Sequence, residues 1–358
     1  MIFGVLSRYF ARYFLKTVLA VFGGVFFLIF TIDLVETLRR SGETAKATGP
    51  LMVWLSFLHT PIVAEQALPF ALLLGSMIAF LNLSRRLELV VARAAGVSVW
   101  QFLAPALVIA AGIGVVEVTL YNPISTAMKQ QSNLIEAKMY GSGRSSSGSF
   151  WLRQRSIDGA SIIHVGARDP QAGFLNVQVF NFDPDGSFSQ RVDAAKGTLE
   201  PGFWRLEDAT VVTPGFTSET SSTYLLATSL SKTEVEQAFA APELVSFWRL
   251  SELGAQVERA GLDGTPYQLR FQQLIALPGL LVAMVLVASC FSLRLFRMGG
   301  VQRMVTGGVA SGFVLYVASK VVGDLGGVGI VGPAVAGWAP AVVGCLFGVY
   351  VLLHQEDG

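Results

Sequence analysis

The sequence predicts a membrane α-helical protein with six transmembrane helices and an extracytoplasmic, all-β, jellyroll-like domain inserted between spans three and four. Three observations predict this fold class. The 358 residues are 52% hydrophobic and only 14% charged, whereas soluble domains carry about 25% charged residues. Six apolar runs are each long enough to cross a bilayer. One polar, strand-rich stretch interrupts them, and a formal net charge of +1 leaves no basic footprint for nucleic acid.

The first span is expected over residues 14–32. Arg8, Arg12 and Lys16 lie at its start, and the positive-inside rule therefore puts the N-terminus in the cytoplasm. The small-x-small sequence Ala45-Lys46-Ala47 comes too late after the run for signal-peptide cleavage. We therefore expect an uncleaved helix.

The outer end of this first helix is unusually charged, with Asp33, Glu36, Arg39 and Arg40. Two interpretations stay open. The residues are a solvated helix end in which Glu36 and Arg40 form a favourable i,i+4 pair, or they are a headgroup site in which Arg39 and Arg40 face anionic groups.

Residues 51–83 form a second apolar stretch of 33 residues. At 1.5 Å per residue this helix is roughly 50 Å long, which exceeds the hydrocarbon core of a bilayer. We expect it to tilt, project or bend, with bends at Pro61 and Pro69. Glu65 lies between these prolines, and we favour a solvated turn over a transport role for it.

A short basic helix, residues 85–96, is expected on the cytoplasmic side between the second and third spans. Leu87, Val90, Val91 and Ala94 share one face at helical spacing. The remaining charged side chains lie on the other face, and Gly96 is the expected C-cap. The helix either rests on the bilayer surface or docks into a cytoplasmic partner. The charged residues of this segment are Arg85, Arg86, Glu88 and Arg93.

The third span is expected over residues 99–121, with Glu117 near its outer end, and a helical connector follows over residues 124–140. Short alternating strands then begin. Turn sequences at 183–186 and 200–202 predict two hairpins, and the strand spacing suggests an antiparallel sandwich or roll. The expected strands are 162–165, 175–182, 188–192, 197–199, 203–206 and 224–227.

Three further spans are expected over residues 274–293, 304–322 and 328–353. The loop between the first two of these carries Arg294, Arg297 and Arg303 and no acidic residue. This charge bias agrees with both termini being cytoplasmic. The expected organisation is therefore spans one to three over residues 1–140, the β domain over 141–245, and connector plus spans four to six over 246–358.

The fifth span contains a small-residue pattern that permits close helix approach. Internal packing is the commoner explanation, and contact with a second membrane subunit is the alternative. The residues are Gly307, Gly308, Ser311 and Gly312.

No motif for chemistry stands out. Cys290 and Cys345 lie in apolar runs, and His59, His164 and His354 lack metal-ligand spacing. The sequence contains no P-loop, HExxH or GxSxG motif. We therefore expect no catalytic residue, no metal and no bound cofactor. If nucleotide energy is used, another chain supplies it.

Several segments resemble the LptF/LptG family of lipopolysaccharide export permeases, in particular its LptG branch. They are GVLSRYFARYFLK at residues 4–16, ALPFALLLGSMIAFLNLSRRLELVVARAAGVS at 67–98, EAKMYG at 136–141 and MGGVQRMVTGGVASGFVLYV at 298–317. The resemblance implies an ABC exporter subunit that extracts lipopolysaccharide from the inner membrane and passes it to a periplasmic bridge. Its implied partners are an LptF-like sister permease, an LptB-like ATPase dimer that holds ATP and magnesium, and an LptC-like single-span protein.

The resemblance also assigns roles to residues. The short helix becomes a coupling helix that seats in the ATPase, with Arg85, Arg86, Leu87, Glu88, Val90, Val91 and Arg93 as its contacts. The first and fifth spans border gates toward the sister subunit. Four aromatic residues of the first span either contact acyl chains or are ordinary packing side chains. They are Phe22, Phe26, Phe27 and Phe30.

One position departs from the family pattern. LptG-type relatives can carry a lysine inside the outer end of the first span, where this sequence has Asp33. A carboxylate repels a lipid phosphate unless a cation intervenes. We hypothesise that Arg39 and Arg40 take over the phosphate clamp.

Other classes fit less well. A mechanical ABC-type subunit that drives a periplasmic partner without moving lipid is the main alternative, and it would need packed spans instead of a wide apolar chamber. A hydrolase based on the serine-rich loop at 142–149 lacks a nearby base. An ion-coupled carrier using Glu65, Glu117 or Asp324 would leave the β domain unexplained.

Overall fold

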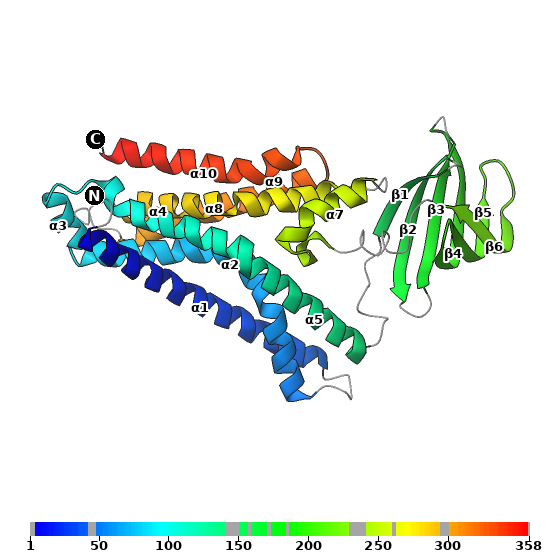
Figure 1. Ribbon diagram of the computed structural model, residues 1–358, viewed down its shortest axis with the longest axis horizontal. Helices are drawn as coiled ribbons and strands as arrows, with labels where there is room; N and C mark the ends of the chain where they lie inside the picture. The colour runs from blue at the N-terminus through cyan, green and yellow to red at the C-terminus, as the bar shows by residue number, and fades with distance from the viewer. Residues whose placement is uncertain are drawn as a thin grey trace.

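The computed structural model shows a bundle of long helices with a β domain beyond one end (Figure 1). It describes residues 4–41, 48–140, 150–156, 159–169, 173–183, 186–228, 241–259, 263–293 and 301–356. The serine-rich stretch at 142–149, the small-x-small sequence at 45–47 and the basic residues Arg294 and Arg297 lie outside these ranges.

Six of the described helices are long and apolar enough to cross a membrane, as predicted. The helices at 5–41, 49–85 and 301–327 extend beyond both ends of the apolar runs that predicted them, because polar first and last turns continue the same helix, whereas the last helix begins at residue 333 and not at 328. The long helices are α1 (Val5–Ser41), α2 (Gly49–Arg85), α4 (Val99–Val116), α8 (Thr265–Ser292), α9 (Val301–Gly327) and α10 (Pro333–Glu356). The third span continues from α4 through a π-helical turn, η1 (Glu117–Tyr121), into α5 (Asn122–Tyr140).

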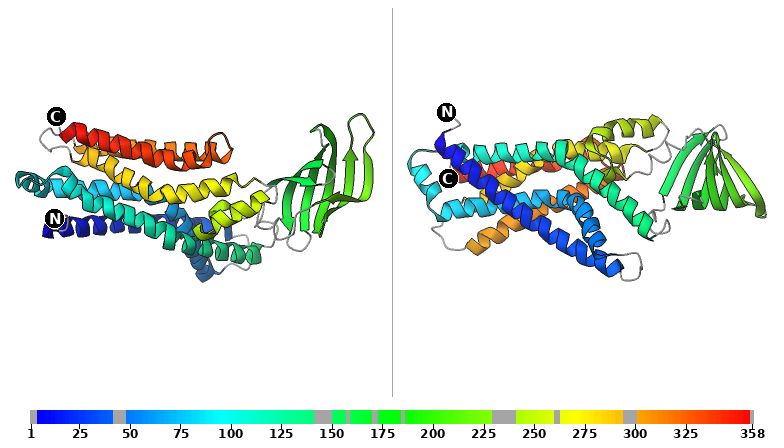
Figure 2. Two further views of the ribbon diagram at one scale, coloured as in Figure 1. Left: turned by 45° about the horizontal axis from the view of Figure 1, so that its top comes forward. Right: turned by 60° about the horizontal axis from the view of Figure 1, so that its bottom comes forward.

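The short elements lie at the two ends of the bundle. Helix α3 (Glu88–Ala94) joins α2 to α4, whereas the 3₁₀ turn η2 (Pro242–Leu244) and α7 (Phe247–Arg259) lead from the β domain back to α8. All three views place α3 and both chain termini at the end of the bundle that is far from the β domain (Figures 1 and 2). This arrangement agrees with the expected location of the short basic helix.

Helix α2 is 37 residues long and remains helical through Pro61 and Pro69. Figure 1 shows that its first part runs steeply across the bundle before the rest aligns with the other helices. A proline removes one backbone hydrogen bond and crowds the preceding turn, which bends a helix without ending it. The excess length predicted from the sequence is therefore absorbed by a bend.

Helix α8 occupies the centre of the bundle, and its neighbours approach it through glycines. A Cβ added to Gly114 of α4 would lie 2.5 Å from the Cα of Pro278. One added to Gly348 of α10 would lie 2.6 Å from the Cβ of Leu286. Small residues at such crossings let helix backbones pack closely inside a membrane. The main core around α8 is correspondingly dense, and it includes the fully buried Leu281 and Val285.

The β domain is one antiparallel sheet in which the described strands neighbour one another in chain order, β1 to β6. The strands are β1 (Phe150–Ser156), β2 (Gly159–Asp169), β3 (Gly173–Phe182), β4 (Phe188–Glu200), β5 (Phe203–Val212) and β6 (Glu219–Ala227). Both predicted hairpins, β3–β4 and β4–β5, are present. Strand β1 was not predicted, because its sequence FWLRQRS lacks a clear alternation of apolar and polar residues.

The sheet is rolled so that its two edge strands meet. The side chain of Gln154 in β1 donates to the carbonyl oxygen of Ala227 in β6 at 3.1 Å, and the hydroxyl of Thr228 donates to the amide oxygen of Gln154 at 2.6 Å. The inner face buries a core that includes Trp204 and Leu206. The expected roll is thus formed by a sequential meander, and no two-sheet sandwich is present among the described strands.

We predict that Gly114→Ala lowers stability and that Gly112→Ala does not. The new methyl group at position 114 would overlap the backbone of α8, whereas no atom lies within 4 Å of an added Cβ at Gly112. Overpacking costs about 1–3 kcal/mol, while alanine is by itself the better helix former. Thermal unfolding of the two variants in detergent tests this, and equal midpoints would contradict the assigned crossing.

Candidate functional site

Helix α3 begins directly after α2. Arg85 is the last residue of α2, and only Arg86 and Leu87 separate it from Glu88. Leu87 has a φ of 60°, in the left-handed region that disfavours residues with a side chain. The predicted helix at 85–96 is therefore shorter in the structure, where it covers 88–94. The sequence did not reveal this boundary because leucine carries no turn signal.

The end of α3 follows the prediction. Gly96 has a φ of 82°, and the amide of Val97 donates to the carbonyl oxygen of Ala92 at 3.1 Å. A glycine in this conformation just after the last turn satisfies helix carbonyls that would otherwise lack donors.

The face of α3 that the sequence analysis called apolar points away from the bundle. Leu87 is 59% exposed and Val91 is 66% exposed, whereas Leu89 and Ala92 are buried. Val90 is also exposed. The helix is thus anchored through one pair of side chains and presents three large apolar ones at the end of the molecule.

Two tyrosines of α1 contact the charged residues of this segment. The hydroxyl of Tyr9 donates to the Glu88 carboxylate at 3.3 Å. The guanidinium of Arg86 lies over the ring of Tyr13, 5.8 Å from its centroid. Arg85 and Arg93 are exposed. This link was not predicted, although the i,i+4 spacing of Tyr9 and Tyr13 places both rings on one face of α1.

At the C-terminal end of α1, both arginines fold back onto Glu36. Its carboxylate accepts hydrogen bonds from the Nε and Nη2 atoms of Arg39, both at 2.9 Å, and from the Nε of Arg40 at 2.7 Å. The predicted Glu36–Arg40 pair is present, and Arg39 joins it. The two arginine side chains are 76% and 72% exposed, so they remain accessible.

Asp33 is not an isolated carboxylate. Its Oδ1 lies 2.5 Å from the Nδ1 of His59 in α2, and its second oxygen is buried without a hydrogen-bond partner in the described part of the chain. Lys129 of α5 is close enough for its charge to act on Asp33. The expected repulsion of a lipid phosphate is therefore moderated by two basic groups that the sequence analysis did not associate with this position.

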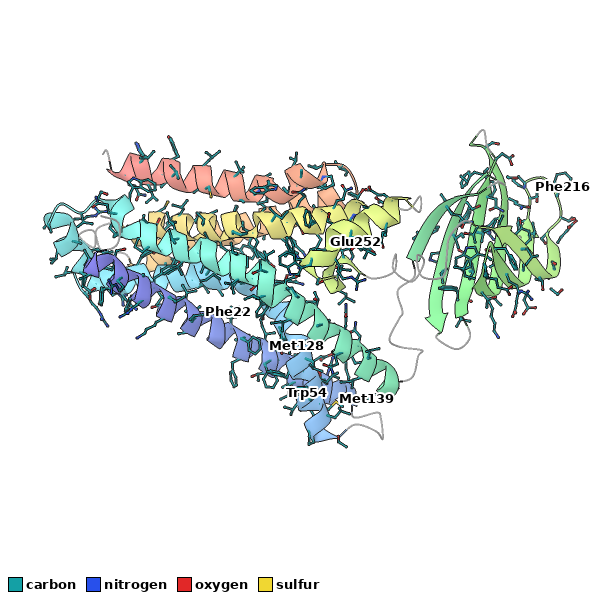
Figure 3. All side chains as sticks on the ribbon, in the orientation of Figure 1. Phe22, Trp54, Met128, Met139, Phe216 and Glu252 are labelled. Atoms are coloured by element: carbon teal, nitrogen blue, oxygen red, sulfur yellow. The ribbon has the colours of Figure 1, made fainter. Side chains whose placement is uncertain are left out.

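The four aromatic residues of α1 divide between two environments. Phe22 (labelled in Figure 3) packs edge-on against Tyr121, with ring centroids 6.4 Å apart. Phe26 and Phe30 are half-buried, and Phe27 is 68% exposed. Of the four, Phe27 is the most available for contact with a lipid chain or another helix.

The small residues of α9 pack inside this chain. A Cβ added to Gly308 or Gly312 would overlap the side chains of Met77 and Leu73 in α2, and one at Gly307 would crowd Phe291. Ser311 is half-buried. This is the internal packing that the pattern favoured. The outward face of α9 carries large apolar side chains instead, and these include Phe313, Val314, Val317 and Val321.

Glu65 corrects an expectation of the sequence analysis. It lies inside the continuous helix α2 and is 5% exposed, so it is not part of a solvated turn. Its Oε1 lies 2.5 Å from the Nη2 of Arg270 in α8. Asn122 and Ser125 also donate to it. Arg270 is 205 positions away in sequence, so no local pattern could have shown this ion pair.

A cavity of about 510 Å³ lies between α2, α8, α9 and α10. The Glu65–Arg270 pair lines one wall, and Lys320 and Asp324 of α9 line another. Leu277, Leu280 and Tyr316 supply apolar surface. A cavity with apolar walls and a few charged groups suits an amphiphilic molecule.

The model of the family "Lipopolysaccharide export system permease LptF/LptG" matches residues 8–354. The chain belongs to the LptF/LptG family. It is similar to the lipopolysaccharide export system permease protein LptG of Escherichia coli, with 25% identity over 368 residues that cover 99% of both chains. It is also similar to LptG of Haemophilus influenzae, with 26% identity over 89% of this chain and 90% of that protein.

Membership of the LptF/LptG family confirms the resemblance stated from the sequence segments. Together with the six apolar helices, it makes this chain a multi-pass inner-membrane permease of lipopolysaccharide export. The match covers both helical parts and the β domain, so the whole architecture belongs to this LptF/LptG permease family.

We predict that Tyr9→Phe loosens α3. The change removes one exposed hydrogen bond to Glu88, and amide hydrogen exchange over residues 88–94 should therefore rise, by roughly two- to three-fold. Tyr13→Phe keeps the ring beneath Arg86 and is the matched control. Equal exchange in the two variants would show that the Tyr9 hydroxyl does not hold α3.

Proposed function

We propose that this chain is the LptG-like permease subunit of an ABC exporter that extracts lipopolysaccharide from the inner membrane and passes it to a periplasmic bridge toward the outer membrane. Its similarity to two lipopolysaccharide export permeases supports this cargo. In this proposal the chain has no catalytic residue and binds no cofactor, because ATP and magnesium are held by a separate LptB-like ATPase dimer.

The observation that carries the proposal is the exposed apolar face of α3. Leu87, Val90 and Val91 are exposed, yet they lie between arginines on a helix whose other side is anchored. Apolar side chains presented in this way favour burial in a partner. In each view α3 projects farther from the β domain than the chain termini do (Figure 2), which favours a soluble cytoplasmic partner over the bilayer surface.

A second membrane subunit is supported by the two helices that this chain covers least. Only 6% of the most apolar window of α1 and 11% of that of α9 are buried within the chain. We propose that an LptF-like sister packs against these helices and that the two subunits enclose the lipid. Gly307, Gly308, Ser311 and Gly312 then support the gate from inside by holding α9 on α2 and α8.

The lipid headgroup is proposed to bind at the outer end of α1, where Arg39, Arg40, His59 and Lys129 surround two carboxylates. Charge-assisted bonds from arginine suit phosphate groups. Exchange of Glu36 for a lipid phosphate would leave both arginines paired. The acyl chains would contact Phe27 and the outward face of α9.

The orientation follows from the charge distribution. We propose that α3 and both termini face the cytoplasm, because Arg8, Arg12, Arg85, Arg86 and Arg93 gather at that end. The β domain then lies in the periplasm, where its rolled sheet receives lipid together with an LptC-like single-span partner.

Purification from native membranes, followed by reconstitution, tests the function. A complex that contains an ATPase and a second six-span subunit, and that transfers lipopolysaccharide to an acceptor in an ATP-dependent way, is expected. ATP-driven movement of a periplasmic partner without lipid transfer would instead identify a mechanical transducer.

Glu88→Lys should weaken ATPase association at least ten-fold while leaving membrane insertion intact. Reversal of a charge beside an apolar contact surface typically costs several kcal/mol at an interface. Co-purification of the ATPase measures the loss, with the exposed His354→Ala at the same end as the control. If the Glu88→Lys variant binds the ATPase and transports normally, the Glu88 carboxylate is not part of the docking surface.

The double variant Arg39→Glu/Arg40→Glu should abolish crosslinking of lipopolysaccharide to a photoreactive residue at position 27 in cells. Glu36→Gln is the matched variant, since it releases both arginines from their internal acceptor and should keep or raise the yield. An unchanged yield in the double variant would reject the arginine clamp.

A further inference from the structure

Two buried carboxylates and one arginine lie together in the outer part of the bundle. Glu65 of α2 is 5% exposed and Glu117 of η1 is 4% exposed. Arg270 of α8 ion-pairs with Glu65. Glu117 is close enough to both residues for their charges to act on it. Ionisable groups inside a membrane protein are costly unless paired, so this cluster requires an explanation.

Glu65 is fully satisfied. Besides Arg270, it accepts hydrogen bonds from the Nδ2 of Asn122 at 3.0 and 3.2 Å and from the hydroxyl of Ser125 at 2.9 Å. Both donors are buried residues of α5. The two carboxylate oxygens therefore keep neutral donors even without the guanidinium.

Glu117 is in the opposite situation. Its Oε1 is buried and has no hydrogen-bond partner within the described ranges of the chain. An unpaired acceptor at such depth is unfavourable. A guanidinium has five N–H donors in a planar fork, and Arg270 reaches Glu65 through Nη2. Other donors of the same side chain are therefore chemically suited to Glu117.

The backbone changes its helical geometry at Glu117. Glu117 begins the π-helical turn η1, and such turns are rare and frequently occur at functional sites. One turn earlier, Gly114 brings the backbone of α4 so close to Pro278 of α8 that a Cβ at position 114 would overlap the Pro278 Cα. This crossing is a natural pivot for α8 against the third span.

The cluster also contacts the chain that returns from the β domain. The side-chain oxygen of Asn122 accepts from the amide of Phe247, the first residue of α7, at 2.9 Å. Gln130 donates to the carbonyl oxygen of Leu244 in η2 at 2.7 Å. Through Asn122, the acceptor of Arg270 is thus connected to α7, the helix that follows the β domain in the chain.

We propose that Arg270 is a two-position latch: it holds α8 to Glu65 in this conformation and pairs with Glu117 in a second conformation of the transport cycle. The proposal deepens the proposed function and rests on it, because a cycle driven by an ATPase requires two arrangements of the spans. A shift of α8 by about one helical turn, roughly 5 Å, is of the size seen when packed helices change register.

The two carboxylates differ in the hydrogen-bond donors that they keep when Arg270 is absent. When Arg270 leaves Glu65, Asn122 and Ser125 still stabilise that carboxylate. When Arg270 arrives at Glu117, it satisfies an acceptor that otherwise has none. Each conformation therefore has one fully paired and one less satisfied carboxylate, which is the property of a bistable element.

The test uses the complete complex in lipid nanodiscs, with spin labels at Leu120→Cys on η1 and Gln268→Cys on α8. Both positions are exposed, and Cys290 and Cys345 are replaced by alanine. Electron–electron distance measurements are made without nucleotide and after trapping with ADP-vanadate. The complex with native Glu65, Glu117 and Arg270 should show one distance between the labels without nucleotide. After trapping, a second population with a shifted distance should appear.

Glu117→Gln keeps the shape of the side chain and removes its charge. It should reduce the second population at least five-fold and lipid transfer about ten-fold, with ATP hydrolysis changed less than two-fold. Glu117→Asp should restore part of both. Glu65→Gln should raise the second population without nucleotide. Glu252→Gln on α7, an exposed position bonded to Gln256 (Figure 3), should behave as the wild type.

Three outcomes would overturn the latch: an unchanged distance distribution on trapping, Glu117→Gln behaving as the wild type, or Glu65→Gln leaving the second population at its original level. The last measurement needs no nucleotide and decides the case if Glu117→Gln fails to assemble. Absence of lipid transfer by the wild-type complex would instead count against the proposed function, while the distances would still report on Arg270.

Discussion

Close contact around α8 is the constraint on which the rest of the structure depends. Inside a bilayer, apolar helices gain little by exchanging lipid for one another, so van der Waals fit and small residues determine where they cross. Gly114 and Gly348 bring α4 and α10 onto α8, and Gly75 brings α2 onto Val18 of α1 in the same way. In this conformation, these crossings set the positions of the two ends of the bundle relative to each other.

Polar groups then select one arrangement among those that apolar packing permits. Glu65 connects α2 to α5 and α8, and His59 connects α2 to α1 through Asp33. A buried charge without its partner is unfavourable, so each pair disfavours helix registers in which its members find no other partner. At the end of the bundle that carries α3, Tyr9 and Tyr13 have a similar role, although in a more exposed setting.

Features that depend on local sequence could be predicted, and those that depend on distant partners could not. Hydropathy located all six spans, and the turn at Asp183 and Gly186 located a hairpin, because both signals act over a few residues. The Asp33–His59 and Glu65–Arg270 pairs join different helices, and no periodicity carries such information. The predicted start of α3 was wrong for another reason. Leu87 has a strained left-handed backbone conformation, and no residue preference in the sequence predicts it.

That strained leucine has a mechanical consequence. The joint between α2 and α3 consists of two residues, one of which is in a backbone conformation costing about 1–2 kcal/mol. Such a short connection has few alternative backbone conformations. A displacement applied to α3 is therefore transmitted almost fully to the 37-residue helix α2. A glycine-rich connection between α2 and α3 would be free of backbone strain, but it would be flexible and would transmit less of that displacement.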